Sequence, residues 1–140
     1  MSVLYTAHAT ATGGRNGEVK SSDGLLSFGL SIPKEMGGPG RAGATNPEQL
    51  FACGYAACFC SAIEFVARMQ KLALSHLDVS AAVGIGKDAT SFALSVVLSV
   101  RIGGLDAAAA QSLVEAAHQV CPYSKATRNN VPVELKVELV

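Results

Sequence analysis

The sequence predicts an α+β fold in which antiparallel sheets surround one long, buried central helix, in the order β-β-β-α-β-β-α-β. Two observations support this prediction. Stretches that alternate polar and apolar residues, separated by Gly-rich and Asn- or Asp-containing turns, are typical of strands. Two longer apolar segments follow helix-start signals. The length of 140 residues, without an evident linker, predicts a single domain over residues 1–140.

The N-terminal part is predicted to form a meander of three short strands. Turns are expected at residues 13–17 and 22–24, because Gly and Asn adopt backbone angles that other residues avoid. The predicted strands cover residues 2–12, 18–21 and 25–32. Residues 33–43 contain two prolines and four glycines. We therefore expect a loop there, and a loop of this length is often functional.

The central helix is predicted over residues 47–70. Thr45 or Asn46 can cap it, and Pro47 suits the first helical position. Glu48 lies where the helix dipole favours a negative charge. The first half of this helix is apolar nearly all round, so we expect it to be buried on every side.

The C-terminal part is predicted to add two strands, a second helix and a last strand. Proline cannot continue a helix, so Cys121-Pro122 should end the second helix. The predicted elements are strands at 77–86 and 91–102, a helix at 107–120, a turn or short helical piece at 123–130, and a strand at 131–140.

The charge balance argues against nucleic acid as a partner. Lys+Arg and Asp+Glu each number 11, so the formal net charge is zero. Charged residues make up only 16% of the chain, whereas a globular domain usually carries about a quarter. The shortfall indicates that part of the surface is covered, most simply by a second copy of the chain.

No membrane attachment is expected. The N-terminus lacks the basic start and apolar run of a signal peptide. The longest apolar stretch is interrupted by Gly54, Ser61 and Glu64, and falls short of the roughly 20 residues that a membrane span needs. We therefore expect a soluble, cytoplasmic protein, in which cysteines are reactive thiols or small buried groups rather than structural disulfides.

Helical spacing separates the four cysteines. Cys53 and Cys60 are seven residues apart and share a face, whereas Cys58 and Cys60 point to nearly opposite sides. Cys53 and Cys60 are therefore interpreted as small buried apolar residues. Cys121 lies at a helix end, where its thiol could meet that of Cys58 if the two helices cross. The spacing permits this contact without requiring it.

Neither a metal nor another cofactor is expected. The three cysteines at 53, 58 and 60 lie on one helix and cannot wrap a tetrahedral zinc ion, and no histidine lies at ligand spacing. His8, His76 and His118 show no pairing with an acidic residue that would suggest base catalysis, so we interpret them as structural or surface residues.

A reactive thiol needs a nearby cation, because burial alone raises its pKa. Arg15, in the Gly-rich turn, is a candidate. A guanidinium stays charged when it is partly desolvated, and it can bond a thiolate and a carboxylate together. The alternative is that Arg15 is a solvated turn residue.

The chain resembles the organic hydroperoxide resistance proteins, within the larger family that includes the osmotically inducible OsmC proteins. The resemblance covers essentially the whole chain. The matching segments are Gly14-Arg15-Asn16-Gly17, Thr45-Asn46-Pro47-Glu48-Gln49-Leu50-Phe51, Gly54-Tyr55-Ala56-Ala57-Cys58-Phe59, Val120-Cys121-Pro122-Tyr123-Ser124 and Ala126-Thr127-Arg128. Cys53 and Cys60 are additional to the family pattern.

The resemblance implies a thiol peroxidase that reduces alkyl and fatty-acid hydroperoxides. Cys58 would be the peroxidatic thiol and Cys121 the resolving thiol that closes a disulfide with it. Arg15 and Glu48 would activate the nucleophile. The family implies an intertwined homodimer with active sites at the subunit interface, and a dihydrolipoyl group on a lipoylated protein as the reductant.

The substrate side of the site is predicted to be apolar. Phe51, Phe59 and Tyr123 are the candidate substrate-binding residues, since apolar surroundings favour an organic chain. Alternative functions are a non-enzymatic dimer that binds apolar ligands, a thiol redox sensor, and an OsmC-type peroxidase with a different peroxide preference.

Glu48 and Cys58 are ten residues apart on the predicted helix, which is about 15 Å along its axis. That separation is too large for Glu48 to act on Cys58 of its own chain through Arg15. We therefore expect the activating Glu48, together with Arg15, to come from the other subunit.

Overall fold

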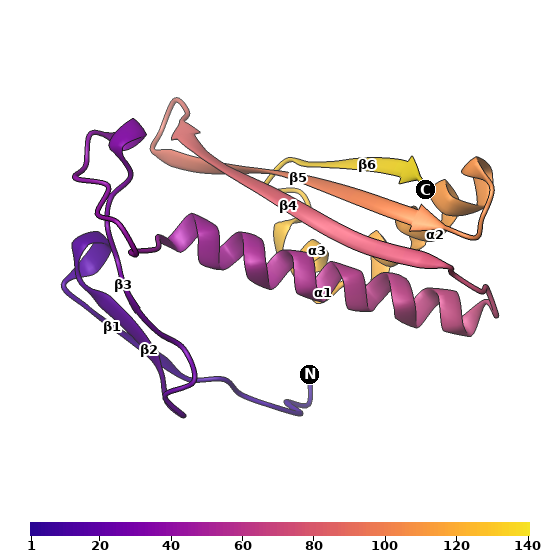
Figure 1. Ribbon diagram of the computed structural model, residues 1–140, viewed down its shortest axis with the longest axis horizontal. Coiled ribbons are helices and arrows are strands. Elements are labelled where there is room, and N and C mark those ends of the chain that lie inside the picture. Colours follow the sequence, from indigo (N-terminus) through magenta and orange to yellow (C-terminus); the bar gives the residue numbers. More distant parts are fainter. The chain divides into compact units, whose positions relative to one another are not determined.

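A computed structural model describes residues 1–140 of the chain (Figure 1). The chain divides into two compact units, Met1–Leu50 and Phe51–Val140. Each unit is described by itself, and the expectation of a single domain stays a prediction.

The N-terminal unit contains the predicted three-stranded meander. Its strands are β1 (Ala9–Thr12), β2 (Glu18–Ser21) and β3 (Ser27–Gly29), paired antiparallel in that order. A 3-10 turn at Gly14–Asn16 lies between β1 and β2, and another at Lys34–Met36 follows β3. β2 has its predicted bounds, whereas β1 and β3 are shorter than predicted and residues 2–8 form no strand. Leu30 and Ser31 are the only buried residues of this unit, so it has almost no core of its own.

The central helix α1 (Pro47–Met69) begins where its start signals predict. The side-chain oxygen of Asn46 accepts a hydrogen bond from the Gln49 backbone N–H at 2.8 Å, which identifies Asn46 as the cap. Pro47 occupies the first helical position, where its missing N–H costs nothing.

The C-terminal unit has a sheet of β4 (His76–Lys87), β5 (Phe92–Gly103) and β6 (Val133–Leu139). β4 and β5 pair antiparallel along twelve residues. β6 runs parallel to β5, which differs from the predicted all-antiparallel arrangement. The reason is the helical connection between β5 and β6, which returns the chain to the end of the sheet where β5 began.

That connection consists of α2 (Ala107–Val120) and α3 (Pro122–Thr127). α2 has its predicted bounds, and the Asp106 side chain caps it by accepting the Ala109 N–H. Pro122 ends α2 as predicted, but it also begins α3, because its fixed φ suits a first helical position. Cys121 is therefore the single residue between the two helices.

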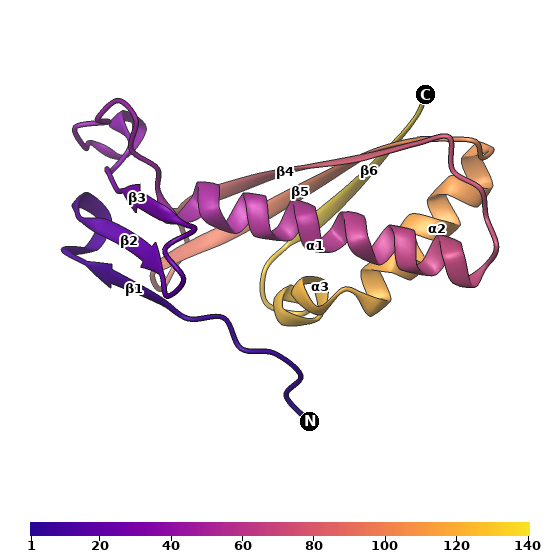
Figure 2. The same ribbon diagram turned by 60° about the horizontal axis from the view of Figure 1, so that its bottom comes forward.

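One face of the sheet, one face of α1 and one face of α2 form the core, and Figure 2 shows α1 running along the sheet with α2 and α3 near it. The fully buried side chains include Tyr55, Phe59, Ile63, Leu98 and Leu113. The prediction that the first half of α1 is buried on every side is wrong for the single chain, because Cys53 and Ala57 are exposed.

α1 is long and apolar enough to cross a membrane, contrary to the sequence-based expectation. Its 23 residues have a window of mean hydropathy 1.7. Tyr55, Phe59, Ile63 and Val66 pack into the protein core, and 33% of that window is buried.

Candidate active site

Two predicted site residues meet in the C-terminal unit. The Sγ atoms of Cys58 and Cys121 lie 3.8 Å apart, although 63 positions separate the residues in sequence. Cys58 comes from α1 and is partly exposed, whereas Cys121 is fully buried at the junction of α2 and α3. The pair thus has one thiol open to a reactant and one protected from it.

The surroundings of Cys58 within its own unit do not favour a thiolate. Burial is the main cause that raises the pKa of Cys58, and the adjacent Cys121 thiol raises it further. The backbone N–H of Tyr123 donates toward Cys58 and acts in the opposite direction. A nucleophilic thiolate at this position therefore needs a positive charge from elsewhere.

The other two predicted catalytic residues meet in the N-terminal unit. Arg15 and Glu48 form a bidentate pair, with Nη1 to Oε2 at 2.9 Å and Nη2 to Oε1 at 2.6 Å. The Glu48 side chain is only 11% exposed and that of Arg15 is 35% exposed. The hydrogen bonds from Arg15 lower the pKa of Glu48, against an opposing effect of burial, so the pair is charged.

The turn that carries Arg15 needs glycine. A Cβ at Gly17 would meet the Thr12 carbonyl group, and Gly13 has a φ of 76°. The Asn16 side chain accepts the Ile32 backbone N–H at 3.0 Å, which ties the turn to the following loop. Arg41 also donates to the Leu30 carbonyl at 2.7 Å. Arg15 therefore sits on a braced turn rather than a free loop, and the solvated-turn alternative does not describe it.

The predicted substrate-binding residues lie in an aromatic cluster. Phe51 and Tyr123 are partly exposed, with ring centroids 6.3 Å apart, and both rings contact Tyr55. Tyr123 rests over Gly54, where a Cβ would come within 3.0 Å of its hydroxyl. Phe59 is fully buried and packs against Tyr55 and His118 instead.

The two additional thiols are in different settings. Cys53 is exposed on α1. Cys60 is half-buried, and burial followed by the nearby Glu64 and Asp78 carboxylates raises the pKa of its thiol. Such a thiol is protonated and a poor nucleophile. No group of three or more His, Cys, Asp or Glu side chains is arranged to hold a metal ion.

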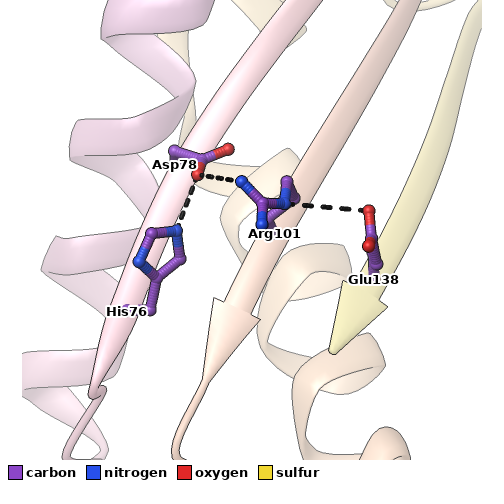
Figure 3. A network of polar contacts seen from close by, with 4 residues as sticks. All are labelled: His76, Asp78, Arg101 and Glu138. Carbon is purple, nitrogen blue, oxygen red and sulfur yellow. Dashed lines mark hydrogen bonds and ion pairs between the residues drawn. The ribbon is translucent and has the colours of Figure 1, made fainter. Parts of the chain in front are cut away.

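A set of charged side chains lies on the exposed face of the C-terminal sheet (Figure 3). His76 Nε2 is 2.6 Å from Asp78 Oδ2, Arg101 Nη1 donates to the same oxygen at 3.2 Å, and Glu138 lies 3.8 Å from Arg101 Nε. His76 pairs with Asp78 because residues i and i+2 share a face of a strand. Each side chain is at least 42% exposed. Exposed ion pairs contribute about 0–1 kcal/mol, so we assign these residues to the sheet surface.

Sequence reasoning missed a set of polar residues that lie near the two cysteines in sequence. The buried side chains of Tyr55, Ser124 and Thr127 and the partly buried side chain of His118 are joined by hydrogen bonds. The partners of Tyr55 lie 69 and 72 positions away in sequence. The only signal in the sequence was that polar residues such as Tyr55 stand among apolar neighbours.

Comparison with known proteins agrees with the geometry. The model of the OsmC-like protein family matches residues 38–136. The chain is 54% identical to the organic hydroperoxide resistance protein of Xanthomonas axonopodis pv. citri, over 95% of this chain and 94% of that protein.

Two solved structures have the same fold over nearly their whole length. One is an organic hydroperoxide resistance protein from Legionella pneumophila, at a TM-score of 0.92 and 50% identity, covering 98% of this chain and 99% of that one. The other is described as a putative organic hydroperoxide resistance protein from Vibrio cholerae with captopril in one of its active sites, at a TM-score of 0.90 and 55% identity, covering 98% and 94%. The α+β fold and the resemblance are thereby confirmed, and the chain belongs to the OsmC-like family, among the organic hydroperoxide resistance proteins.

Proposed function

We propose that this protein is a cysteine-based peroxidase that reduces organic hydroperoxides to alcohols and so acts in the response to oxidative stress. The observation that carries the proposal is the 3.8 Å separation of the Cys58 and Cys121 sulfur atoms, with one thiol accessible and the other buried. The function named for the relatives in Xanthomonas and Legionella supports the choice of substrate class.

The cycle has three steps. The Cys58 thiolate attacks the distal peroxide oxygen, the O–O bond breaks, and the alkoxide leaves and takes up a proton, which gives an alcohol and a Cys58 sulfenic acid. The Cys121 thiol then attacks the Cys58 sulfur, which forms a disulfide and releases water. A dihydrolipoyl dithiol reduces that disulfide by thiol–disulfide exchange and becomes the cyclic lipoyl disulfide.

The Arg15–Glu48 pair supplies the positive charge that Cys58 lacks. The guanidinium stabilises the thiolate and the charge that develops on the leaving oxygen, and Glu48 holds the guanidinium in orientation. We assign this pair to the partner subunit, because Glu48 precedes Cys58 on α1 by ten residues, about 15 Å along a helix axis.

Several features favour a homodimer. The N-terminal unit has almost no core, and Val3, Leu4 and Tyr5 are exposed by 65–97%. The outer face of α1 presents Phe65 and Met69, exposed by 47% and 69%. The related Vibrio cholerae protein is described as having more than one active site.

The substrate is proposed to lie against the aromatic cluster. Phe51 and Tyr123 offer partly exposed rings, and Phe59 packs from the core against Tyr55, which both of these rings contact. A thiol–disulfide cycle that depends on a lipoyl reductant requires a reducing compartment, so we propose the cytoplasm as the location.

Turnover tests the proposal. With excess dihydrolipoamide, the protein should consume many equivalents of cumene hydroperoxide, and more slowly of hydrogen peroxide. Cys58→Ser should abolish turnover, whereas Cys60→Ser, two residues along the same helix, should retain it. A binding protein would consume no peroxide and a sensor would stop after one equivalent, so either result would refute the enzyme. Equal rates with hydrogen peroxide would favour the OsmC-type preference.

Subunit complementation tests the shared site. Cys58→Ser and Arg15→Ala chains are each inactive, but a mixed dimer contains one site with Cys58 and Arg15 both intact if the site is shared. Random mixing should recover roughly a quarter of wild-type activity, since half of the dimers would carry one working site of two. No recovery in verified mixed dimers would show that Arg15 acts on Cys58 of its own chain.

A further inference from the structure

A continuous chain of polar side chains crosses the core of the C-terminal unit. His118 Nδ1 lies 2.8 Å from Ser124 Oγ, Ser124 Oγ lies 3.0 Å from Tyr55 Oη, and Tyr55 Oη lies 3.2 Å from Thr127 Oγ1. Tyr55 and Ser124 are fully buried and Thr127 is 3% exposed. We call these four residues the hydroxyl–imidazole chain.

Every buried polar atom of the side chains has a partner. Hydroxyl groups are unfavourable in a core unless they are hydrogen-bonded. Hydrogen bonds restrict both distance and direction, whereas apolar contacts restrict direction only weakly. A fully satisfied chain of this kind therefore holds the elements that carry it in one arrangement.

Members of the hydroxyl–imidazole chain lie three residues from each of the two cysteines in sequence. Tyr55 precedes Cys58 by three residues on α1, and His118 precedes Cys121 by three residues on α2. Ser124 follows Cys121 by three residues on α3. The hydrogen bonds thus join the helix of Cys58 to both helices that flank Cys121, and Figure 2 shows α1 and α3 side by side.

A further bond closes the bend at Cys121. Arg128 Nη2 donates to the His118 carbonyl oxygen at 2.8 Å, so the end of α3 is tied to the last turn of α2. Cys121 is held from both sides: its backbone N–H donates to the Ala117 carbonyl oxygen of α2, and its carbonyl oxygen accepts from the Lys125 N–H of α3, each at 2.9 Å. The position of Cys121 therefore follows the arrangement of the two helices. Small rotations of α3 would move its sulfur relative to Cys58.

We propose that the hydroxyl–imidazole chain positions Cys121 for attack on the oxidised Cys58, and that His118, Ser124 and Tyr55 are positioning residues for disulfide formation. This inference rests on the proposed peroxidase function. The sulfur atoms must approach from 3.8 Å to a bond length of about 2.05 Å. Misplacement by about 1 Å can slow such an intramolecular step by about a hundredfold.

The inference separates two steps of the cycle. Attack on the peroxide requires Cys58 and the cation, but not Cys121, so loss of the hydroxyl–imidazole chain should leave this step unchanged. Condensation with Cys121 should slow. A longer-lived sulfenic acid reacts with a second hydroperoxide, which yields a sulfinic acid and a second alcohol.

The experiment follows both steps in the full-length dimer. Reduced protein is mixed with cumene hydroperoxide, sulfenic acid is trapped at short times, and disulfide and sulfinic acid are quantified by mass spectrometry. Ser124→Ala removes the central hydroxyl, and Tyr55→Phe removes one oxygen with little change of volume. His118→Asn retains a polar group near Nδ1, and Ser112→Ala, on the exposed face of α2, is the matched control.

For Ser124→Ala and Tyr55→Phe we expect disulfide formation to slow by about tenfold or more, while Cys58 oxidation stays within about twofold of the wild type. Sulfinic acid should appear at lower peroxide concentrations. His118→Asn should retain much of the wild-type rate, and Ser112→Ala all of it. If Ser124→Ala does not fold, the milder Tyr55→Phe decides the comparison.

Wild-type disulfide rates in both variants would overturn the inference, as would equal slowing of the two steps, which would indicate general damage. If the wild-type protein itself forms no Cys58–Cys121 disulfide, the proposed function fails instead. The two failures are therefore distinguishable.

Discussion

Oxidation of Cys58 and Cys121 to a disulfide should stabilise the folded protein substantially. Cys58 lies on α1 and Cys121 lies between α2 and α3, 63 positions away in sequence, and their sulfur atoms are already 3.8 Å apart. Closing the bond therefore needs little rearrangement of the native state, while it restricts the unfolded chain strongly.

The size of the effect follows from the length of the closed loop. In the chain-entropy model, a cross-link over 63 positions removes about 14 cal/mol/K from the unfolded state, which is about 4 kcal/mol at 25 °C. For a chain of 140 residues, the corresponding rise in Tm is about 10–15 °C.

Urea unfolding and thermal scans of reduced and oxidised protein measure the difference. The protein concentration must be held constant, because the stability of an oligomer depends on it. A Cys53→Ser, Cys60→Ser background limits oxidation to the pair of interest, and Cys121→Ser is the control that should show no gain. An oxidised form no more stable than the reduced form would refute the reasoning, since the bond would then strain the fold as much as it restricts the unfolded chain.

Three further predictions concern single side chains. Glu48→Gln removes the carboxylate whose pKa Arg15 lowers, so it should reduce the free energy of unfolding by about 1 kcal/mol at pH 7. The difference between variant and wild type should vanish as the pH falls well below the ordinary Glu value of 4.5. Equal stability of variant and wild type at pH 7 would contradict the pairing. Burial, reinforced by the charge of Arg128, lowers the pKa of His118. Its contribution to the free energy of unfolding is therefore present above pH 6.5 and is lost as the pH falls through the lower pKa of the folded state. His118→Asn should flatten this dependence of stability on pH, and an unchanged slope would contradict a role of His118 in it. Gly54→Leu should cost about 1–3 kcal/mol, because its Cβ would come within 3.0 Å of the Tyr123 hydroxyl. The cost should be much smaller in a Tyr123→Ala background, and the same cost in both backgrounds would exclude this contact.

Local signals in the sequence were sufficient for most of the secondary structure. The bounds of α2 and the start of α1 were predicted because capping residues and Pro47 act within one turn of the helix. The prediction of secondary structure was weaker where the same residue type can indicate two different structures. Pro122 ends one helix and begins the next. The alternating residues 2–8 form no strand, although the His8 carbonyl oxygen accepts a hydrogen bond from the Ser22 N–H at 2.9 Å.

Burial and strand direction were harder to predict than element type. The apolar first half of α1 indicated burial on every side, but only one face packs in the single chain. Sequence composition does not tell which face of an apolar helix packs into the core and which face stays exposed. The parallel direction of β6 depends on how the α2–α3 connection crosses the unit, which strand patterns do not encode.

The sequence alone determined the family, the order of the elements and the identity of the four proposed catalytic residues, because these depend on local motifs and their spacing. Only the tertiary structure decided that Cys121 approaches Cys58 to 3.8 Å, that Arg15 pairs with Glu48, and that Ser124 and Tyr55 meet beside the thiols. These contacts join residues 33 to 69 positions apart. Their geometry results from the packing of whole helices and turns, which no short segment of the chain specifies.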